Sequence, residues 1–273
     1  MTVRRSLLTS TLAIAMVVVG LLPLLWALES SLTPEAQLFD RPSLMPATFT
    51  LDHYRALFAE RAFWVPIANS LIVAGMTTLV SVVIGAHCAY ALARLRFRGK
   101  ALLLALVLAI SMFPQISVVP PLFLVLRAAG LINTYTGLVL PYLTFATPLT
   151  VWFLVAFFRQ LPRELEEAAM IDGAGRLYTF WSIVLPLAWP GLAATAVLTF
   201  LYSWNEFLFA LVFTLGPERY TVPVAIALFR GQYQVPWGQV LAGALVATAP
   251  VIGLVLLVQR RIVQGLTSGA IKG

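Results

Sequence analysis

Hydrophobic residues gather in six long stretches that are separated by short polar segments. An α-helix needs roughly 20 apolar residues to cross the hydrocarbon core of a bilayer, and each stretch reaches about that length. The stretches are apolar at consecutive positions, whereas strands of a membrane barrel would alternate at every second residue. The pattern therefore predicts six transmembrane helices, at about 7–28, 66–93, 101–126, 138–158, 187–212 and 240–259.

Composition supports lipid as the main solvent of this chain. Of its 273 residues, 60% are hydrophobic and 11% are charged, against roughly 45–50% and 25% in soluble domains. The mean hydropathy is +0.92. These values exclude a water-soluble enzyme, and they exclude a disordered chain, which needs low hydrophobicity and high charge. The predicted fold class is an all-α integral membrane protein, with residues 1–273 forming a single transmembrane domain.

The net charge of +7 reflects basic residues in the segments between the stretches, which argues against nucleic acid as a partner. Cytoplasmic loops of membrane proteins carry an excess of Lys and Arg. With six spans both termini share one side, and twelve basic residues lie there against six on the other side. We therefore expect both termini in the cytoplasm. The twelve are Arg4, Arg5, Arg94, Arg96, Arg98, Lys100, Arg159, Arg163, Arg176, Arg260, Arg261 and Lys272; the six are Arg41, Arg55, Arg61, Arg127, Arg219 and Arg230.

Two features near the N-terminus need separate interpretation. The first stretch is longer than the apolar part of a signal peptide, and no small-x-small cleavage site follows it, so we expect an uncleaved helix.

In the external segment 29–65, Leu51, Tyr54, Leu57 and Phe58 recur at helical spacing. This predicts a short helix, which either lies at the membrane interface or packs as a tether on the bundle.

The sequence contains no signature of ATP hydrolysis or metal binding. Gly99-Lys100 is followed by Ala101 and lacks the preceding glycine of a phosphate loop. One cysteine and two histidines are too few for a disulfide or a convincing metal site. We therefore expect a non-catalytic membrane subunit without a cofactor of its own.

Residues 163–182 predict an elbow of two short cytoplasmic helices. Pro162 suits a first helical turn, the acidic residues after it favour the positive end of a helix, and Gly173 suits a left-handed stop. A second helix is expected from Arg176 to Ser182. Apolar side chains on such an elbow need a partner surface, which is either this chain's own helices or another protein.

The same segment carries a recognisable motif. Glu167-Ala168-Ala169, Gly173 after three residues and Ile183-x-Leu185-Pro186 after nine more resemble the EAA signature of ABC-importer permease subunits. In that family the elbow is the coupling helix, which sits in a cleft of the ATP-hydrolysing subunit. The resemblance implies that Glu167, Ala168, Ala169, Asp172 and Gly173 transmit ATP-driven motion to the permease. Glu167 would be the polar contact, Ala168 and Ala169 would be small packing residues, and Gly173 would form the bend.

Other segments resemble the carbohydrate branch of that family, and the MalG-type subunit of maltose and trehalose importers in particular. These segments are Asn69-Ser70-Leu71, Ala89-Tyr90-Ala91-Leu92-Ala93-Arg94, Trp204-Asn205-Glu206-Phe207 and the tail 260–273. The resemblance implies the type I ABC-importer permease fold in a bacterial or archaeal cytoplasmic membrane. It also implies that tail residues Thr267 and Ser268 form a second contact with the ATPase.

The resemblance further implies a substrate class and a set of partners. The substrate would be a sugar, such as the disaccharides trehalose or maltose, with glycerol phosphate or an oligosaccharide as alternatives. The partners would be a second permease, two ATPase subunits that bind ATP and Mg, an extracytoplasmic sugar-binding protein and membrane lipid. An ion-coupled secondary transporter is disfavoured because no inverted repeat is evident.

Polar residues within the spans are candidates for a substrate path, because polar groups at this depth are costly and usually face the bundle interior. The candidates are Asn69, Tyr202, Trp204, Asn205 and Glu206. The alternative for Glu206 and Asn69 is a structural hydrogen bond or helix cap, and the sequence favours it for both. Prolines in the third and fourth stretches, at 114, 120, 121, 141 and 148, should bend or end helices.

Overall fold

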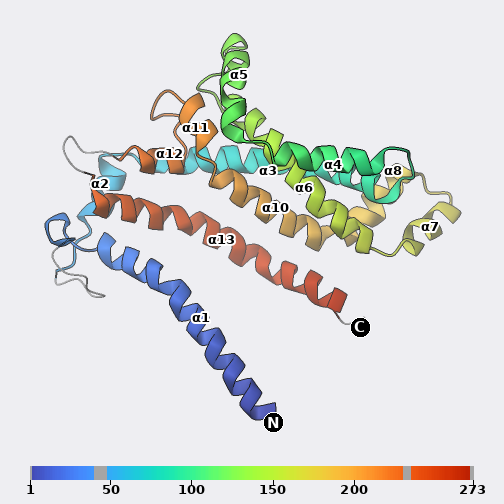
Figure 1. Ribbon diagram of the computed structural model, residues 1–273, viewed down its shortest axis with the longest axis horizontal. Helices are drawn as coiled ribbons and strands as arrows, with labels where there is room; N and C mark the ends of the chain where they lie inside the picture. The colour runs from blue at the N-terminus through green and yellow to red at the C-terminus, as the bar shows by residue number, and fades with distance from the viewer. Residues whose placement is uncertain (1, 40–47, 230–234, 271–273) are drawn as a thin grey trace. The chain divides into compact units, whose positions relative to one another are not determined.

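The structure is a computed structural model of the chain. It describes residues 2–39, 48–229 and 235–270, and within these ranges it describes the side chains of residues 10–259. Every regular element within them is helical, and they contain no strand (Figure 1). This agrees with the all-α fold that the apolar pattern predicts.

Four of the described helices are individually long and apolar enough to cross a membrane. They are α1 (Thr2–Ser31), α3 (Trp64–Arg94), α6 (Tyr135–Gln160) and α13 (Trp237–Ala270). Two further pairs of helices pass the same test together, each pair being sharply bent. The structure therefore accommodates up to six spans, as the sequence predicts, although two of the six are not straight.

The third predicted span is broken near its middle. Helix α4 (Lys100–Ser111) is followed by α5 (Gln115–Ala128) at an angle of 89°. Pro114 occupies the N-cap of α5, where it has no N–H to continue the preceding helix, and it disfavours helical geometry at Phe113. The expectation that proline ends a helix is met at Pro114, whereas Pro120 and Pro121 lie within α5, and Pro141 and Pro148 lie within α6. The continuous span predicted over 101–126 is not observed.

The fifth predicted span is also interrupted. Helix α10 (Trp189–Trp204) ends at Asn205, and a separate short helix, α11 (Leu208–Phe213), follows it. A bend of 76° separates α10 from the helical run Arg176–Leu187 before it. The predicted helix 187–212 is therefore two helices, joined at the Asn205-Glu206 pair.

Contacts divide the chain into two compact units. The larger unit holds 65–224 with 250–273, and the smaller holds 1–64 with 225–249. Helix α12 (Val222–Ala227) and helix α13 run across the division.

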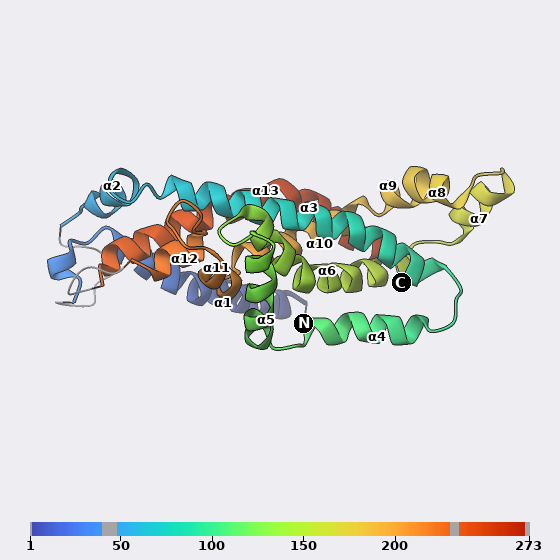
Figure 2. The same ribbon diagram turned by 90° about the horizontal axis from the view of Figure 1, so that it is seen from above.

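In the larger unit α3 and α6 pack closely, since a side chain at Gly85 would meet Thr150 at 2.8 Å. Helix α4 runs alongside α6 (Figure 2). One core cluster joins the Arg94 end of α3 to the parts of α6 and α10 beside it. A second joins the Asn69 end of α3 to α5, α6 and α11.

The smaller unit contains the predicted short helix, α2 (Asp52–Ala59). Leu57 and His53 form its buried face, and the His53 ring nitrogen Nε2 lies 2.9 Å from the carbonyl of Thr33. The carboxylate of Glu35, in the turn η1 (Glu35–Gln37), accepts hydrogen bonds from the first backbone N–H groups of α13. These bonds hold the polar segment between α1 and α3 to the start of α13.

Candidate coupling elbow and polar residues of the spans

The predicted elbow is present as two short helices that reverse direction at Gly173. Helix α7 (Glu164–Ile171) is followed by α8 (Arg176–Thr179), the π-helical turn η2 (Phe180–Val184) and α9 (Leu185–Leu187). Gly173 has a φ of +85°, a left-handed conformation that only glycine adopts at little cost. The N–H groups of Gly173 and Ala174 donate to the carbonyls of Met170 and Ala169, which is a Schellman helix end.

The elbow exposes large apolar side chains, which together are called its apolar face. Ile171 is 86% exposed, Leu177 is 73% exposed and Tyr178 is 64% exposed. Leu165 of α7 is exposed as well. Because these residues project from short helices beyond the ends of α6 and α10, they form a surface suited to another protein.

Most of the motif residues on the elbow are exposed, and one is buried. Glu167, Ala168, Asp172 and Gly173 are exposed, whereas Ala169 is buried. The small and polar residues that the motif places on the elbow are therefore accessible in this chain, apart from Ala169, which packs inward.

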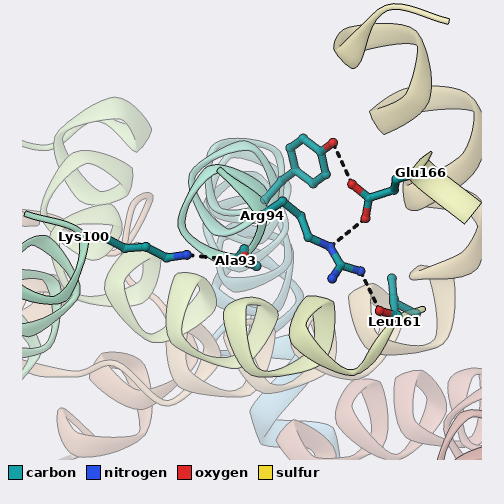
Figure 3. A network of polar contacts seen from close by, with 6 residues as sticks. Ala93, Arg94, Lys100, Leu161 and Glu166 are labelled. Carbon is teal, nitrogen blue, oxygen red and sulfur yellow. Dashed lines mark hydrogen bonds and ion pairs between the residues drawn. The ribbon is translucent and has the colours of Figure 1, made fainter. Parts of the chain in front are cut away.

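The opposite face of α7 carries an acidic residue that the motif does not point to. Glu166 is buried, and its Oε1 lies 2.6 Å from Nε of Arg94, the last residue of α3 (Figure 3). Its other oxygen accepts a hydrogen bond from the Tyr90 hydroxyl at 3.1 Å. Arg94 also donates from Nη2 to the carbonyl of Leu161 at 2.8 Å. Together these contacts attach the elbow to the end of α3.

Sequence reasoning missed this network because Glu166 stands beside the motif glutamate and looks like another exposed acid. Two weak signals were available. Tyr90 and Arg94 are four residues apart and share one face of a helix. Glu166 and Ala169 are three residues apart and share a face of α7.

A cavity of about 410 Å³ adjoins the network. The cations of Arg96, Arg163 and Arg176 line it, together with Arg94, Glu166 and Glu167. The elbow contributes both arginines and glutamates to this cavity, and Arg94 and Arg96 at the end of α3 give its lining an excess of positive charge.

Asn69 of the candidate substrate path is engaged within the protein. Its amide nitrogen donates to the carbonyls of Glu218 and Tyr220, at 3.0 and 2.9 Å, and its oxygen accepts from the Tyr135 hydroxyl at 2.7 Å. The side chain thus holds the segment after α11 against α3. This is a structural use of Asn69, and a place in the substrate path stays a prediction.

Glu206 is buried and serves as a cap. Its carboxylate accepts from the backbone N–H of Phe209 at 2.8 Å and of Ala210 at 3.2 Å, in the first turn of α11. A carboxylate at a helix start is favoured by the helix dipole. The structural interpretation, which the sequence favours, therefore has a specific geometry here.

The three neighbouring candidates lie at the end of α10 in different surroundings. Tyr202 accepts a hydrogen bond from the side chain of Gln115 of α5 at 2.5 Å. Trp204 is buried and stacks on Phe200, whereas Asn205 is exposed and donates to the carbonyl of Leu201. Gln115, at the bend between α4 and α5, is a weaker candidate from the sequence, and the structure brings its side chain to Tyr202.

The predicted tail contacts cannot be placed at the level of side chains. Thr267 and Ser268 belong to the last turns of α13, but their side chains lie outside the described part of the structure.

Comparison with known proteins identifies relatives along nearly the whole chain. Residues 81–268 match the family model described as binding-protein-dependent transport system inner membrane component. The chain is 49% identical over 93% of its length to the trehalose transport system permease protein SugB of Mycobacterium tuberculosis, covering 93% of that protein. It is 42% identical over 96% of its length to the trehalose/maltose transport system permease protein MalG of Thermococcus litoralis, covering 95% of that protein.

A solved structure has the same fold. It is a bacterial ABC transporter involved in the import of the acidic polysaccharide alginate, and a chain of it superposes with a TM-score of 0.76. The alignment covers 93% of this chain and 95% of that chain, at 22% sequence identity. The all-α type I permease fold expected from the sequence is confirmed by this agreement.

Proposed function

Because the chain belongs to the family of binding-protein-dependent transport system inner membrane components, we propose that it is the permease subunit of an ATP-driven sugar importer. It is a multi-pass membrane protein. In this proposal it forms half of the translocation path, a second permease forms the other half, two ATPase subunits hydrolyse ATP, and an extracytoplasmic protein delivers the sugar.

The exposed apolar face of the elbow is the observation that carries this proposal. A stable subunit has little reason to keep Ile171, Leu177 and Tyr178 in water unless another protein covers them. The EAA residues lie on the same elbow, and a family match for the segment comes from an independent comparison. The partner expected there is the ATPase, with Glu167 as polar contact and Ala168 as a site of close approach.

The orientation of the chain follows from the same proposal. Binding of an ATPase requires the elbow to lie in the cytoplasm, which agrees with the positive-inside count that places both termini there. Alternating access then results from differential binding: ATP and the loaded binding protein favour one state of the permease, and hydrolysis favours the other.

A disaccharide such as trehalose or maltose is the proposed substrate, since one relative described above is named for trehalose and the other for trehalose and maltose. The polar groups of Gln115 and Tyr202, where α5 begins and α10 nears its end, offer hydrogen-bond partners for sugar hydroxyls.

The proposal is tested by reconstituting the whole complex in vesicles. ATP-dependent accumulation is measured across a panel of labelled disaccharides, oligosaccharides and glycerol phosphate. Accumulation of a disaccharide supports the proposal, and preference for another solute corrects the substrate. Uptake that persists without ATP and collapses with an ion gradient would contradict the ABC mechanism.

The role of the elbow is tested in the same vesicles with Glu167→Ala. We expect transport and sugar-stimulated ATP hydrolysis to fall roughly tenfold, because coupling between two sites typically corresponds to a factor of this order. The amount of permease inserted in the membrane should be unchanged. Glu164→Ala, an exposed residue of the same helix, is the matched control. Normal stimulated hydrolysis in Glu167→Ala would contradict the coupling role.

A further inference from the structure

The two faces of α7 differ in what they contact. Within this helix Glu166 and Ala169 are buried, and the other side chains are exposed. We propose that the Arg94–Glu166 ion pair is a latch that ties the elbow to α3, so that the two move as one body during transport. The inference rests on the coupling function proposed above and assigns a positioning role to residues outside the motif.

The geometry of Arg94 suits a joint between three segments. Its Nε contacts Glu166 in α7, and its Nη2 donates to the carbonyl of Leu161, which caps the end of α6. Arg94 itself is the last residue of α3. The contact with Glu166 is an ion pair, whereas the contact with Leu161 is a hydrogen bond, so one guanidinium joins both segments to α3.

Exclusion of water strengthens this joint. The side chains of Arg94 and Glu166 are 5% and 11% exposed. An exposed ion pair is screened and contributes little, whereas loss of one member of a buried pair leaves a charge without compensation. The Tyr90 hydroxyl occupies the second carboxylate oxygen, so both oxygens of Glu166 are bound by residues of the last turns of α3.

The second half of the elbow rests on the same stripe of α3. The ring of Phe180 in η2 packs on Tyr90 and His87, with centroid distances of 4.8 and 4.9 Å, and Trp181 packs on His87 at 5.3 Å. His87, Tyr90 and Arg94 follow one another at helical spacing on α3. Apolar packing therefore holds η2, and the polar latch holds α7, whose exposed face would receive the ATPase.

This arrangement predicts how a force on α7 is transmitted. Displacement of α7 by a partner pulls on Glu166, and through Arg94 it pulls on the end of a 31-residue helix. With the latch intact, elbow and α3 move together. Without it, α7 stays bound to its partner and moves independently of α3.

The test uses the complete complex with its partner permease, ATPase and binding protein in vesicles. Glu166→Gln is compared with the double swap Glu166→Arg with Arg94→Glu, and with the matched control Glu164→Gln. Two quantities are measured: sugar molecules transported per ATP hydrolysed, and the amount of ATPase that co-purifies with the permease.

For Glu166→Gln we expect transport per ATP to fall roughly tenfold while the ATPase still co-purifies. The double swap should recover most of the loss, and Glu164→Gln should match the unaltered chain. The latch is overturned if Glu166→Gln keeps normal transport per ATP, or if the double swap assembles with the ATPase but stays uncoupled. If Glu166→Gln does not assemble with the ATPase, the transport per ATP of the assembled double swap decides whether the latch holds.

A distance measurement on the otherwise unaltered complex gives an independent answer. Spin labels at the native Cys88 of α3 and at position 170 of α7 should keep one distance through the ATP cycle, because the latch joins these two helices. A distance that changes with nucleotide overturns the latch. If the unaltered complex shows no ATP-driven uptake, the proposed function fails as well; if it transports and Glu166→Gln is fully coupled, only the latch fails.

Discussion

The two ends of α3 are both fixed by polar side chains, but the bonds differ in kind. At one end Asn69 uses a neutral amide to bind two backbone carbonyls and a tyrosine hydroxyl. Ser70 adds a hydrogen bond from the N–H of Val222. At the other end Arg94 and Glu166 form a charged pair. The amide end holds the segment after α11, whereas the charged end holds α7, which has an exposed face.

The neutral end of α3 is an attachment that holds one arrangement, whereas the charged end transmits movement between two helices. A neutral amide whose donors and acceptor are all engaged stabilises a single arrangement at modest cost. Removal of one member of a buried charge pair leaves the other charge without compensation. Such a pair therefore keeps the two elements that it joins together when one of them is displaced. The difference predicts distinct consequences for substitutions at the two ends.

The largest effect is expected for Arg94→Leu. It leaves the Glu166 carboxylate buried without its cation, which should destabilise the permease by roughly 3–5 kcal/mol. Thermal unfolding in detergent measures this loss. The double variant Arg94→Leu with Glu166→Leu should regain most of the stability, because buried pairs are replaceable by apolar residues.

The double variant also separates the two roles. If the pair is a latch, the stable apolar variant should remain poorly coupled, because two leucines cannot form the ion pair that joins α7 to α3. A double variant that is both stable and fully coupled would show that the pair serves stability alone. The contrast between the two ends of α3 would then disappear.

The latch also shows where sequence reasoning reached its limit. The helix at 52–59 and the bend at Gly173 follow from local patterns, apolar spacing in one case and a glycine after a short helix in the other. Burial of Glu166 depends on an arginine that is distant in the sequence. No local pattern distinguishes it from Glu167, which is exposed one position later.

The breaks in the spans were partly accessible from the sequence. Pro114 signals an interruption, but the 89° angle depends on how α4 packs on α6 and α5 on α11. The end of α10 carries no proline, and its interruption becomes evident only because Glu206 caps a new helix. The candidate substrate path was hard to judge for the same reason, since residue type does not reveal whether a polar group is already engaged.

An intermediate effect is expected for Asn69→Ala, which leaves the carbonyls of Glu218 and Tyr220 without their donor. Each of these part-buried hydrogen bonds contributes roughly 0.5–1.5 kcal/mol, and the segment 214–221 should become more accessible to protease. Asn205→Ala removes an exposed amide that binds only its own helix, and serves as the matched control. A large loss of sugar affinity in Asn69→Ala with unchanged stability would instead place Asn69 in the substrate path.

The smallest effect is expected at Glu218, in the segment that Asn69 holds. The Asn133 amide donates to the Glu218 carboxylate at 2.9 Å, and this hydrogen bond lowers the pKa of Glu218 below its ordinary value of 4.5. A lowered pKa in the folded state means that the carboxylate contributes stability above the ordinary value, and that this contribution is lost as the pH falls through the lowered value. The side chain is exposed, so the contribution is small.

Glu218→Gln tests the sign of that dependence. The unfolding midpoints of the unaltered chain and the variant should differ slightly at pH 7, and the difference should shrink as the pH falls below about 4.5, the ordinary carboxyl value. A difference that grows on acidification would mean that the protonated carboxyl is the stabilising form. In that case the ionised carboxylate would not support the Asn69 end of α3, and the stabilising role assigned to the hydrogen bond from Asn133 to Glu218 would have to be abandoned.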